Sequence, residues 1–275
     1  MHTPGWHRSV AAVTLWCALL SCSGCFRVHV DNPAYPASDT EIEVDWKRMS
    51  DHHVPLGRPV VVLGGYHALN SFPDRVENKL ISVTSGDDDD FLVVSYPWTS
   101  NLGVAADMVI QQVDERWPSG DSQETIEVDV VGVSMGGIVA REAALAQPLR
   151  GGPRKRLKIR RLYTLASPHQ GATAAKYFAF DQAARDMKPG SAYLEQLNAK
   201  LDESRYELVS YAQLRDSTVG ALRAAPPGQQ PIWASGTFGW SHYTTPGNIR
   251  LLADIARRLR GEEPWARADG EPPRN

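Results

Sequence analysis

Residues 131–140 read VGVSMGGIVA, and this short stretch already limits the folds open to the chain. It places Ser134 between Gly132 and Gly136, after an apolar run typical of a buried strand and before a run compatible with a helix. In such a pattern the serine lies on a tight strand-to-helix turn, and the glycines remove side chains that would clash as the chain reverses. The pattern predicts a nucleophilic serine above a sheet, with a purely structural glycine-rich connection as the alternative.

Six apolar runs rich in Val, Leu and Tyr predict strands, and several lack alternation, as strands buried on both faces do. Runs with helical spacing occupy 103–117, 135–147 and 247–260. Alternation of strands and helices predicts an α/β fold with a mostly parallel, doubly wound sheet and helices on both faces. The predicted strands are 59–63, 91–96, 126–133, 161–166, 206–212 and 231–235.

A serine nucleophile needs a general base, and the base needs an orienting acid. Only His169 and His242 follow Ser134, and in this kind of fold the order along the chain is serine, acid, histidine. His242 follows the last predicted strand, where a loop above the sheet would hold the base. We therefore expect His242 to be the base, with His169 as the alternative.

Asp216 is the expected acid, because it follows the predicted strand that precedes the His242 loop. Its alternative role is to cap the N-terminus of a helix. The other acids considered lie in a presumed cap segment or at the wrong end of a strand: Asp181, Asp186, Asp202 and Glu207.

Four segments spread over about residues 58–260 carry a family resemblance: VVVLGGYHA, VGVSMGGIVAR, YTLASPHQGA with DMKPGSAYLEQLN, and SHYTTPGN. With these motifs the chain resembles α/β-hydrolases of the lipase group that includes bacterial triacylglycerol lipases and glycosylphosphatidylinositol inositol-deacylase-like proteins. The resemblance implies an α/β-hydrolase fold with a small cap segment. It also implies that Ser134, Asp216 and His242 form a catalytic triad.

The chain departs from that family after the first predicted strand, where a His-Gly pair is usual and Gly64-Gly65 stands instead. The backbone N–H groups of Tyr66 and Met135 would then form the oxyanion hole. A backbone donor does not depend on the identity of its side chain, so we expect the hole to be retained. The helix that begins near Met135 would aim further N–H groups at developing negative charge.

The N-terminus resembles an export signal. The run 10–20 is apolar and uncharged, too short to span a bilayer and suited to a signal peptide. All three cysteines lie in the first 25 residues, so the remaining chain can form neither a disulfide nor a cysteine metal site. Small residues before Cys22 and Cys25 resemble a bacterial lipobox, which predicts lipidation of one of them. We expect an exported lipoprotein on the periplasmic or cell-surface side of a membrane, with plain secretion as the alternative.

The length of 275 residues suits one sizeable domain with appendages. We expect a signal peptide over 1–25, a linker over 26–54 and a hydrolase domain over 55–261. A possible cap covers 168–205, and a polar, Pro-rich disordered tail covers 262–275.

Charge and composition limit the classes of binding partner that we expect. The net charge of −3 argues against nucleic acid. The carboxylates of Asp87 to Asp90 could bind Ca²⁺, but a contiguous run before a strand is more typical of a solvated turn, so no metal is expected. The chemistry predicted is ester hydrolysis by a lipase or carboxylesterase through an acyl-enzyme, on an ester or lipid substrate and without a cofactor. An acyltransferase with the same triad and a non-catalytic binding protein are the alternatives.

Overall fold

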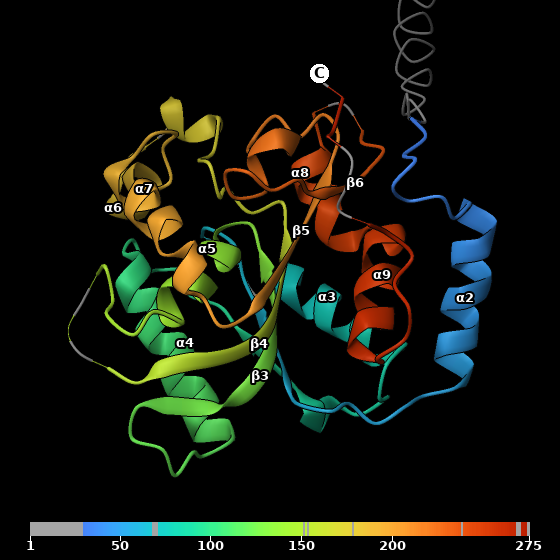
Figure 1. The fold of residues 1–275 in the computed structure, drawn as a ribbon, viewed down its shortest axis with the longest axis horizontal. Coiled ribbons are helices and arrows are strands. Elements are labelled where there is room, and N and C mark those ends of the chain that lie inside the picture. Colours follow the sequence, from blue (N-terminus) through green and yellow to red (C-terminus); the bar gives the residue numbers. More distant parts are fainter. Residues whose placement is uncertain are drawn as a thin grey trace, which may run out of the picture.

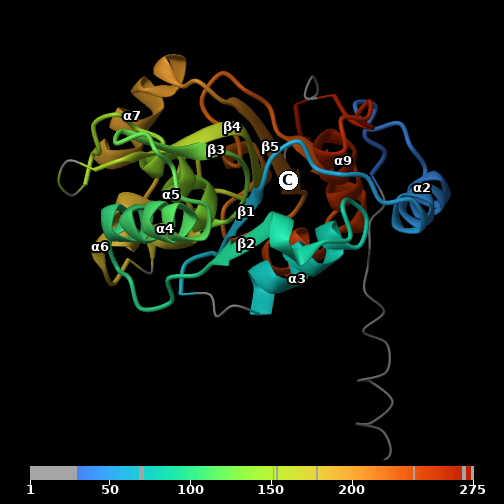
Figure 2. The same cartoon turned by 90° about the horizontal axis from the view of Figure 1, so that it is seen from below.

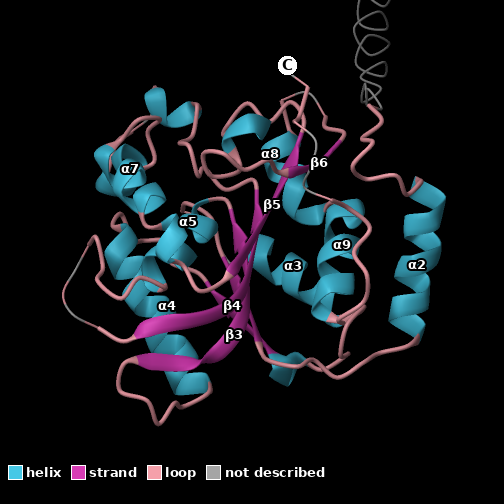
Figure 3. Cartoon of the chain, in the orientation of Figure 1, coloured by secondary structure: helices cyan, strands magenta, loops and turns pink. Residues whose placement is uncertain are grey.

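A six-stranded sheet forms the centre of the molecule (Figures 1 and 3). Its strand order is β2-β1-β3-β4-β5-β6, and Figure 2 labels the first five of these strands. Every neighbouring pair is parallel, so the predicted parallel sheet is confirmed. The strands are β1 (Val60–Leu63), β2 (Phe91–Val94), β3 (Glu124–Val133), β4 (Arg156–Leu165), β5 (Glu207–Gln213) and β6 (Ile232–Ala234). The computed structural model describes residues 30–67, 71–150, 152, 154–177, 179–237, 239–267 and 271–273.

Helices cover both faces of the sheet, as the sequence predicts (Figures 1 and 2). One face carries α3 (Ser71–Ile81) and α9 (Ile249–Leu259), with α2 (Asp39–Asp51) packed outside α9. The other face carries α4 (Leu102–Arg116) and α5 (Met135–Ala143). This is the α/β-hydrolase architecture.

Strand β1 contributes side chains to the apolar cores on both faces of the sheet. Val60 and Val62 belong to the apolar core beneath α3 and α9, whereas Val61 and Leu63 belong to the core beneath α4 and α5. Successive side chains of a strand point to opposite faces, so a strand covered on both faces must be apolar throughout. The unbroken run of β1 is therefore a consequence of its central position.

Short helices fill the loops. Two of them, α6 (Gln182–Asp186) and α7 (Ala192–Ala199), lie between β4 and β5, inside the range in which the cap is expected. The others are η1 (Asp88–Asp90), η2 (Ala174–Lys176), η3 (Leu201–Glu203), η4 (Ala221–Arg223), α8 (Ser241–Thr244) and η5 (Thr245–Gly247).

The predicted linker over 26–54 is wrong for its later part, because α2 is a well-formed helix. Ser38 and Glu41 form a reciprocal capping box at its start, which satisfies two backbone donors that the helix cannot satisfy itself. Ile42 and Met49 are buried in the core that α9 shares. Residues 39–51 are therefore part of the folded domain.

The predicted disordered tail over 262–275 is also wrong for residues 262–267. The indole N–H of Trp265 donates to Asp45 Oδ2 at 2.8 Å, which ties the tail to α2. The backbone N–H of Ala266 donates to the buried carboxylate of Asp254 at 2.8 Å. These contacts pack the segment against α2 and α9.

The predicted signal peptide, with Cys22 and Cys25, lies outside the described residues. Among the residues that the structure describes, no helix combines the length and the apolar character needed to cross a membrane.

The carboxyl ends of the central strands are in register. Leu63 at the end of β1 pairs with Gly132 near the end of β3, and Gln213 at the end of β5 pairs with Ala234 at the end of β6. Residues that follow these strands therefore meet at one edge of the sheet, where ligands bind in open α/β sheets.

Candidate active site

Ser134 lies on the turn between β3 and α5, in a strained conformation. Its backbone has φ 52° and ψ −119°, a region that non-glycine residues rarely adopt. Such strain persists only where the surrounding structure imposes it, and it is concentrated at functional sites. The backbone N–H of Ser134 donates to Leu165 O at 2.8 Å, which fixes the turn against β4.

The glycines around Ser134 are required by space, as the sequence predicts. A Cβ on Gly132 would lie 2.5 Å from the backbone nitrogen of Gly137, and one on Gly136 would lie 2.7 Å from the carbonyl oxygen of Leu63. Both contacts are with backbone, which cannot move aside. Gly132 therefore lets β3 and α5 approach each other at the turn, and Gly136 lets α5 approach the end of β1.

The structure brings Ser134, His242 and Asp216 into one hydrogen-bonded series. The Ser134 hydroxyl donates to His242 Nε2 at 3.1 Å, and His242 Nδ1 donates to Asp216 Oδ2 at 2.9 Å. An ionised carboxylate can accept hydrogen bonds but cannot donate them. The His242 ring therefore carries its proton on Nδ1, facing Asp216, and leaves Nε2 free to accept from Ser134. In the sequence Asp216 lies 26 residues before His242, and Ser134 lies 108 residues before it, so the fold brings the three side chains together.

Asp216 uses its two oxygens differently. Oδ1 accepts the backbone N–H groups of Thr218 at 2.8 Å and Val219 at 2.9 Å, while Oδ2 faces His242. No helix begins directly after Asp216, so these two bonds close a turn, and the helix-cap role considered as the alternative is wrong. With its side chain buried and fixed by two backbone donors, Asp216 can hold the imidazole in one orientation.

The helical turn α8 that carries His242 is anchored to the end of β5. The buried Ser241 hydroxyl lies within hydrogen-bonding distance of Leu214 O at 2.7 Å and Thr237 O at 2.8 Å. Gln213 Oε1 accepts the hydroxyls of Thr244 at 2.9 Å and Thr245 at 3.2 Å. These supports could not be predicted from the sequence, because a glutamine at the end of a strand and a serine at the start of a short helix carry no pattern of their own.

His169, the alternative base, is a structural residue. It is fully buried, its Nδ1 accepts from Arg141 Nη1 at 3.1 Å and its Nε2 donates to Thr164 Oγ1 at 3.0 Å. Burial, and then the Arg141 guanidinium beside it, lower the pKa of His169 well below its ordinary value. A ring held neutral and engaged on both nitrogens cannot serve Ser134.

The alternative acids are engaged elsewhere. Asp186 pairs with Arg150, its Oδ1 lying 2.6 Å from Nη2, and Glu207 pairs with Arg161 at the amino end of β5. Asp202 lies in the short helix η3, and Asp181 contacts the loop after β1. Of the five acids considered, only Asp216 has a hydrogen bond to His242 among the described residues.

The loop after β1 runs against the nucleophile. A Cβ on Gly65 would lie 3.3 Å from the Cβ of Ser134, so the backbone that leads into Tyr66 passes directly beside the serine. The hydroxyl of Tyr96 donates to Gly64 O at 2.7 Å and fixes the start of this loop. Met135 is the first residue of α5, so its N–H has no acceptor within the helix. Both predicted oxyanion donors thus belong to backbone next to Ser134.

Large aromatic side chains near this edge are exposed. Trp98 is 89% exposed, Phe180 83% and Trp240 65%, so Trp98 and Trp240 are not core residues. Tyr243, 56% exposed, lies edge-on to the His242 ring, with centroids 5.8 Å apart. Trp240 and Tyr243 therefore place exposed aromatic surface beside His242.

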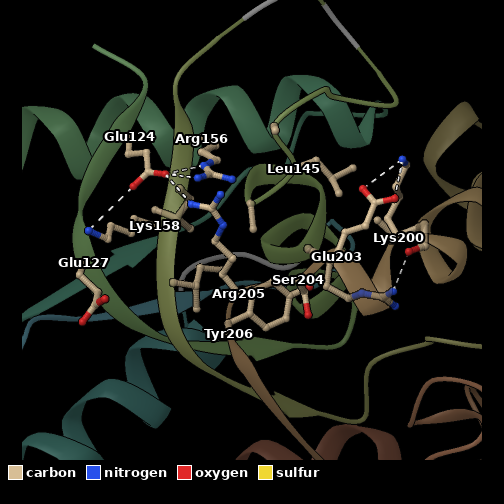
Figure 4. A pocket seen from close by; sticks show the side chains of 16 residues that line it. Glu124, Glu127, Leu145, Arg156, Lys158, Lys200, Glu203, Ser204, Arg205 and Tyr206 are labelled. Atoms are coloured by element: carbon tan, nitrogen blue, oxygen red, sulfur yellow. Dashed lines mark hydrogen bonds and ion pairs between the residues drawn. The ribbon is translucent and has the colours of Figure 1, made fainter. Parts of the chain in front are cut away.

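A pocket of about 240 Å³ lies elsewhere, at the amino ends of β3 and β4 beside the end of α5 (Figure 4). Charged side chains dominate its rim, where Glu124 pairs with Arg156 and Lys200 pairs with Glu203. It contains none of the residues of the hydrogen-bonded series. Within the described ranges, no group of three or more His, Cys, Asp or Glu side chains could hold a metal ion.

A family model described as "PGAP1-like alpha/beta domain" matches residues 104–217. The match agrees with the resemblance seen in the sequence and covers less than half of the chain. Ser134 and Asp216 lie inside the matched span, whereas Tyr66 and His242 lie outside it. No curated protein sequence matches the chain.

Several solved structures are similar in shape. A Bacillus licheniformis lipase in its mature form is 12% identical with a TM-score of 0.44, covering 71% of this chain and 89% of its own. The phospholipase PlaB from Legionella pneumophila is 12% identical with a TM-score of 0.47, covering 74% and 58%. Aspergillus fumigatus lipase B is 12% identical with a TM-score of 0.39, covering 71% and 48%. With identities and TM-scores this low, these likenesses carry no argument about activity.

Proposed function

We propose that the protein is a serine ester hydrolase, a lipase or carboxylesterase, in which Ser134 is the nucleophile. The observation that carries the proposal is the series from Ser134 through His242 to Asp216, built on a strained strand-to-helix turn. Nucleophile, base and orienting acid stand in hydrogen-bond reach of one another, which is the arrangement that activates a serine.

The geometry supports a two-step reaction. His242 Nε2 takes the hydroxyl proton as Ser134 Oγ attacks the ester carbonyl, and Asp216 stabilises the imidazolium that forms. The N–H groups of Tyr66 and Met135 stabilise the oxyanion. His242 then gives its proton to the leaving alcohol, and water attacks the acyl-enzyme with His242 again as base. The acid is released and Ser134 is regenerated.

The exposed aromatic residues support an apolar ester as substrate. Trp240 and Tyr243 flank His242, and their rings lie 6.2 Å apart. Aromatic side chains with one polar end are suited to the boundary between water and lipid. We propose that acyl chains of a lipid or a hydrophobic ester contact this surface.

A panel of p-nitrophenyl esters of graded chain length tests the proposal. We expect turnover with a rapid first release of p-nitrophenol and free acid as the product, because water is the second nucleophile. Adding an alcohol should yield only a minor share of new ester. No turnover of any chain length would contradict the proposal, and a new ester as the main product would indicate an acyltransferase.

We also propose that the chain is exported and anchored by a lipid on Cys22 or Cys25. The described chain enters the fold at the edge that holds Ser134, since the N–H of Val30 donates to the hydroxyl of Ser235, just after β6, at 2.9 Å. Cys22 lies eight residues before Val30, and eight residues span at most about 29 Å. An anchor at either cysteine would therefore keep the active-site edge near a membrane.

The anchor has a direct test in the membrane-extracted protein. We expect a mature chain that begins at Cys22 or Cys25, carries diacylglycerol and partitions into detergent, because two or three acyl chains hold a protein firmly. A protein that starts at Val28 should be soluble and equally active on a short-chain ester. Intact mass spectrometry decides the question, and an unmodified N-terminus or a mature start beyond Cys25 would rule out the anchor.

A further inference from the structure

One acidic side chain in the cap, Asp181, contacts both side chains that follow the Gly64-Gly65 pair. The hydroxyl of Tyr66 donates to Asp181 Oδ2 at 2.8 Å, and His67 Nε2 lies 3.1 Å from the same oxygen. The other ring nitrogen of His67 donates to Pro97 O at 2.5 Å. We propose that Asp181 is a positioning residue that fixes the Tyr66 N–H in the oxyanion hole. This inference rests on the proposed function.

The loop needs such a support because its backbone is strained. His67 has φ 47°, the left-handed region that non-glycine residues disfavour. An oxyanion donor works only if it is held in place before the charge develops, and a displacement of about 1 Å can cost about 10²-fold in rate. Where the usual family pattern has a histidine, the chain has Gly64, which has no side chain, so the loop is held there only through its backbone, by Tyr96 and Val94.

Protonation states make Asp181 the acceptor in this cluster. Burial, then the hydrogen bond to Asp181 and its negative charge, raise the pKa of Tyr66 to about 12, so the hydroxyl keeps its proton. Burial acts to raise the pKa of Asp181, but hydrogen bonds from Ala184 N–H, Tyr66 and His67 outweigh it and lower that pKa. Asp181 is therefore ionised at neutral pH, and it accepts the hydrogen bond of the Tyr66 hydroxyl.

Asp181 is itself held by the cap and the body of the domain. Its Oδ1 accepts the N–H of Ala184 at 2.8 Å as the N-cap of α6. The N–H of Ala183 donates to Ser100 O at 2.8 Å, and Arg150 pairs with Asp186 at the other end of α6. The Asp181 carboxylate thus connects α6 to the loop that carries Tyr66. A shift of α6 would therefore move the Tyr66 backbone N–H.

The test replaces Asp181 without losing the helix cap. Asp181→Ser keeps a good N-cap residue but is too short to reach Tyr66, and Tyr66→Phe removes the same hydrogen bond from the other side while keeping the backbone N–H. Ser191→Ala, which removes the N-cap of α7, is the matched control for a loosened cap. The readout is the rate at which a fluorophosphonate phosphonylates Ser134, together with kcat and KM for a p-nitrophenyl ester per titrated site.

In the labelling step the Ser134 oxygen–phosphorus bond forms, fluoride leaves, and the hydroxyl proton passes to His242. The phosphoryl oxygen occupies the oxyanion hole, so the labelling rate reports the hole without a known substrate. We expect Asp181→Ser and Tyr66→Phe each to lower the labelling rate and kcat by about 10- to 100-fold with KM within about twofold. The double variant should be no worse than the poorer single variant, because Asp181→Ser already removes the hydrogen bond that Tyr66→Phe removes.

Three results would overturn the inference: rates for Asp181→Ser within twofold of wild type, an equal loss in Ser191→Ala, or a change confined to KM. Multiplying losses in the double variant would likewise show that the two residues act separately. A wild-type protein that does not react at Ser134 would instead overturn the proposed function, and this inference with it.

Discussion

Ser134→Ala should abolish ester hydrolysis and leave the fold intact. Loss of the nucleophile of a triad lowers kcat by about 10⁶-fold, since only binding and the oxyanion hole remain. The Ser134 hydroxyl is bonded to His242 and contributes no core packing, so Tm should change by less than about 4 °C. Steady-state kinetics with a p-nitrophenyl ester and a thermal melt measure both effects.

Ser217→Ala is the matched control, because Ser217 is exposed and immediately follows the acid in sequence. It should retain wild-type kcat. Undiminished hydrolysis by Ser134→Ala in a preparation free of other esterases would contradict the assignment of the nucleophile.

Asp216→Asn should lower kcat by up to about 10⁴-fold by stabilising the wrong tautomer of His242. The backbone N–H groups of Thr218 and Val219 need an acceptor, so the amide oxygen will face them and the amide nitrogen will face His242. That nitrogen donates to Nδ1, which moves the ring proton to Nε2, where it blocks transfer from Ser134. The pH–rate profile and kcat per titrated site measure the loss.

The comparison for Asp216→Asn is the same change at two other acids. Asp202→Asn should leave kcat unchanged, and Asp186→Asn should lower stability because it breaks the pair with Arg150. If either change lowers kcat more than Asp216→Asn at equal stability, the acid has been assigned wrongly.

The sheet and the order of the site residues could be predicted because both leave local patterns. Strands buried on both faces, such as β1, must be apolar throughout, and the turn at Ser134 demands glycine at fixed offsets. Once the strands were placed, the parallel topology required residues such as Asp216 and His242 to lie at the same edge. The structure therefore brings together side chains whose spacing in sequence is arbitrary.

The parts that were mispredicted depend on pairings without a local pattern. Helix α2 has only a sparse apolar stripe, although the capping box of Ser38 and Glu41 is a signal that could have located its start. The tail was predicted to be disordered because it is polar, yet Trp265 and Asp45 lie 220 residues apart and stabilise each other. Such contacts follow from the packing of α2 beside α9, which no window of sequence shows.

The contact between Asp181 and Tyr66 could not be predicted from the sequence for the same reason. The two residues are separated by 115 positions. The sequence indicates Asp181 only as an alternative to Asp216 for the acid that orients the base. Its local sequence predicts a helix cap, which it also is, so nothing in the pattern indicates a second role.

The most direct test of the central claim is to react the protein with a fluorophosphonate and locate the adduct by intact mass and peptide mapping. The site geometry predicts one adduct per chain, on Ser134, and none in Ser134→Ala. Asp216→Asn should react far more slowly, because its His242 cannot accept the serine proton. Failure of the folded protein to react, or an adduct on a different serine, would contradict the claim that Ser134 is an activated nucleophile.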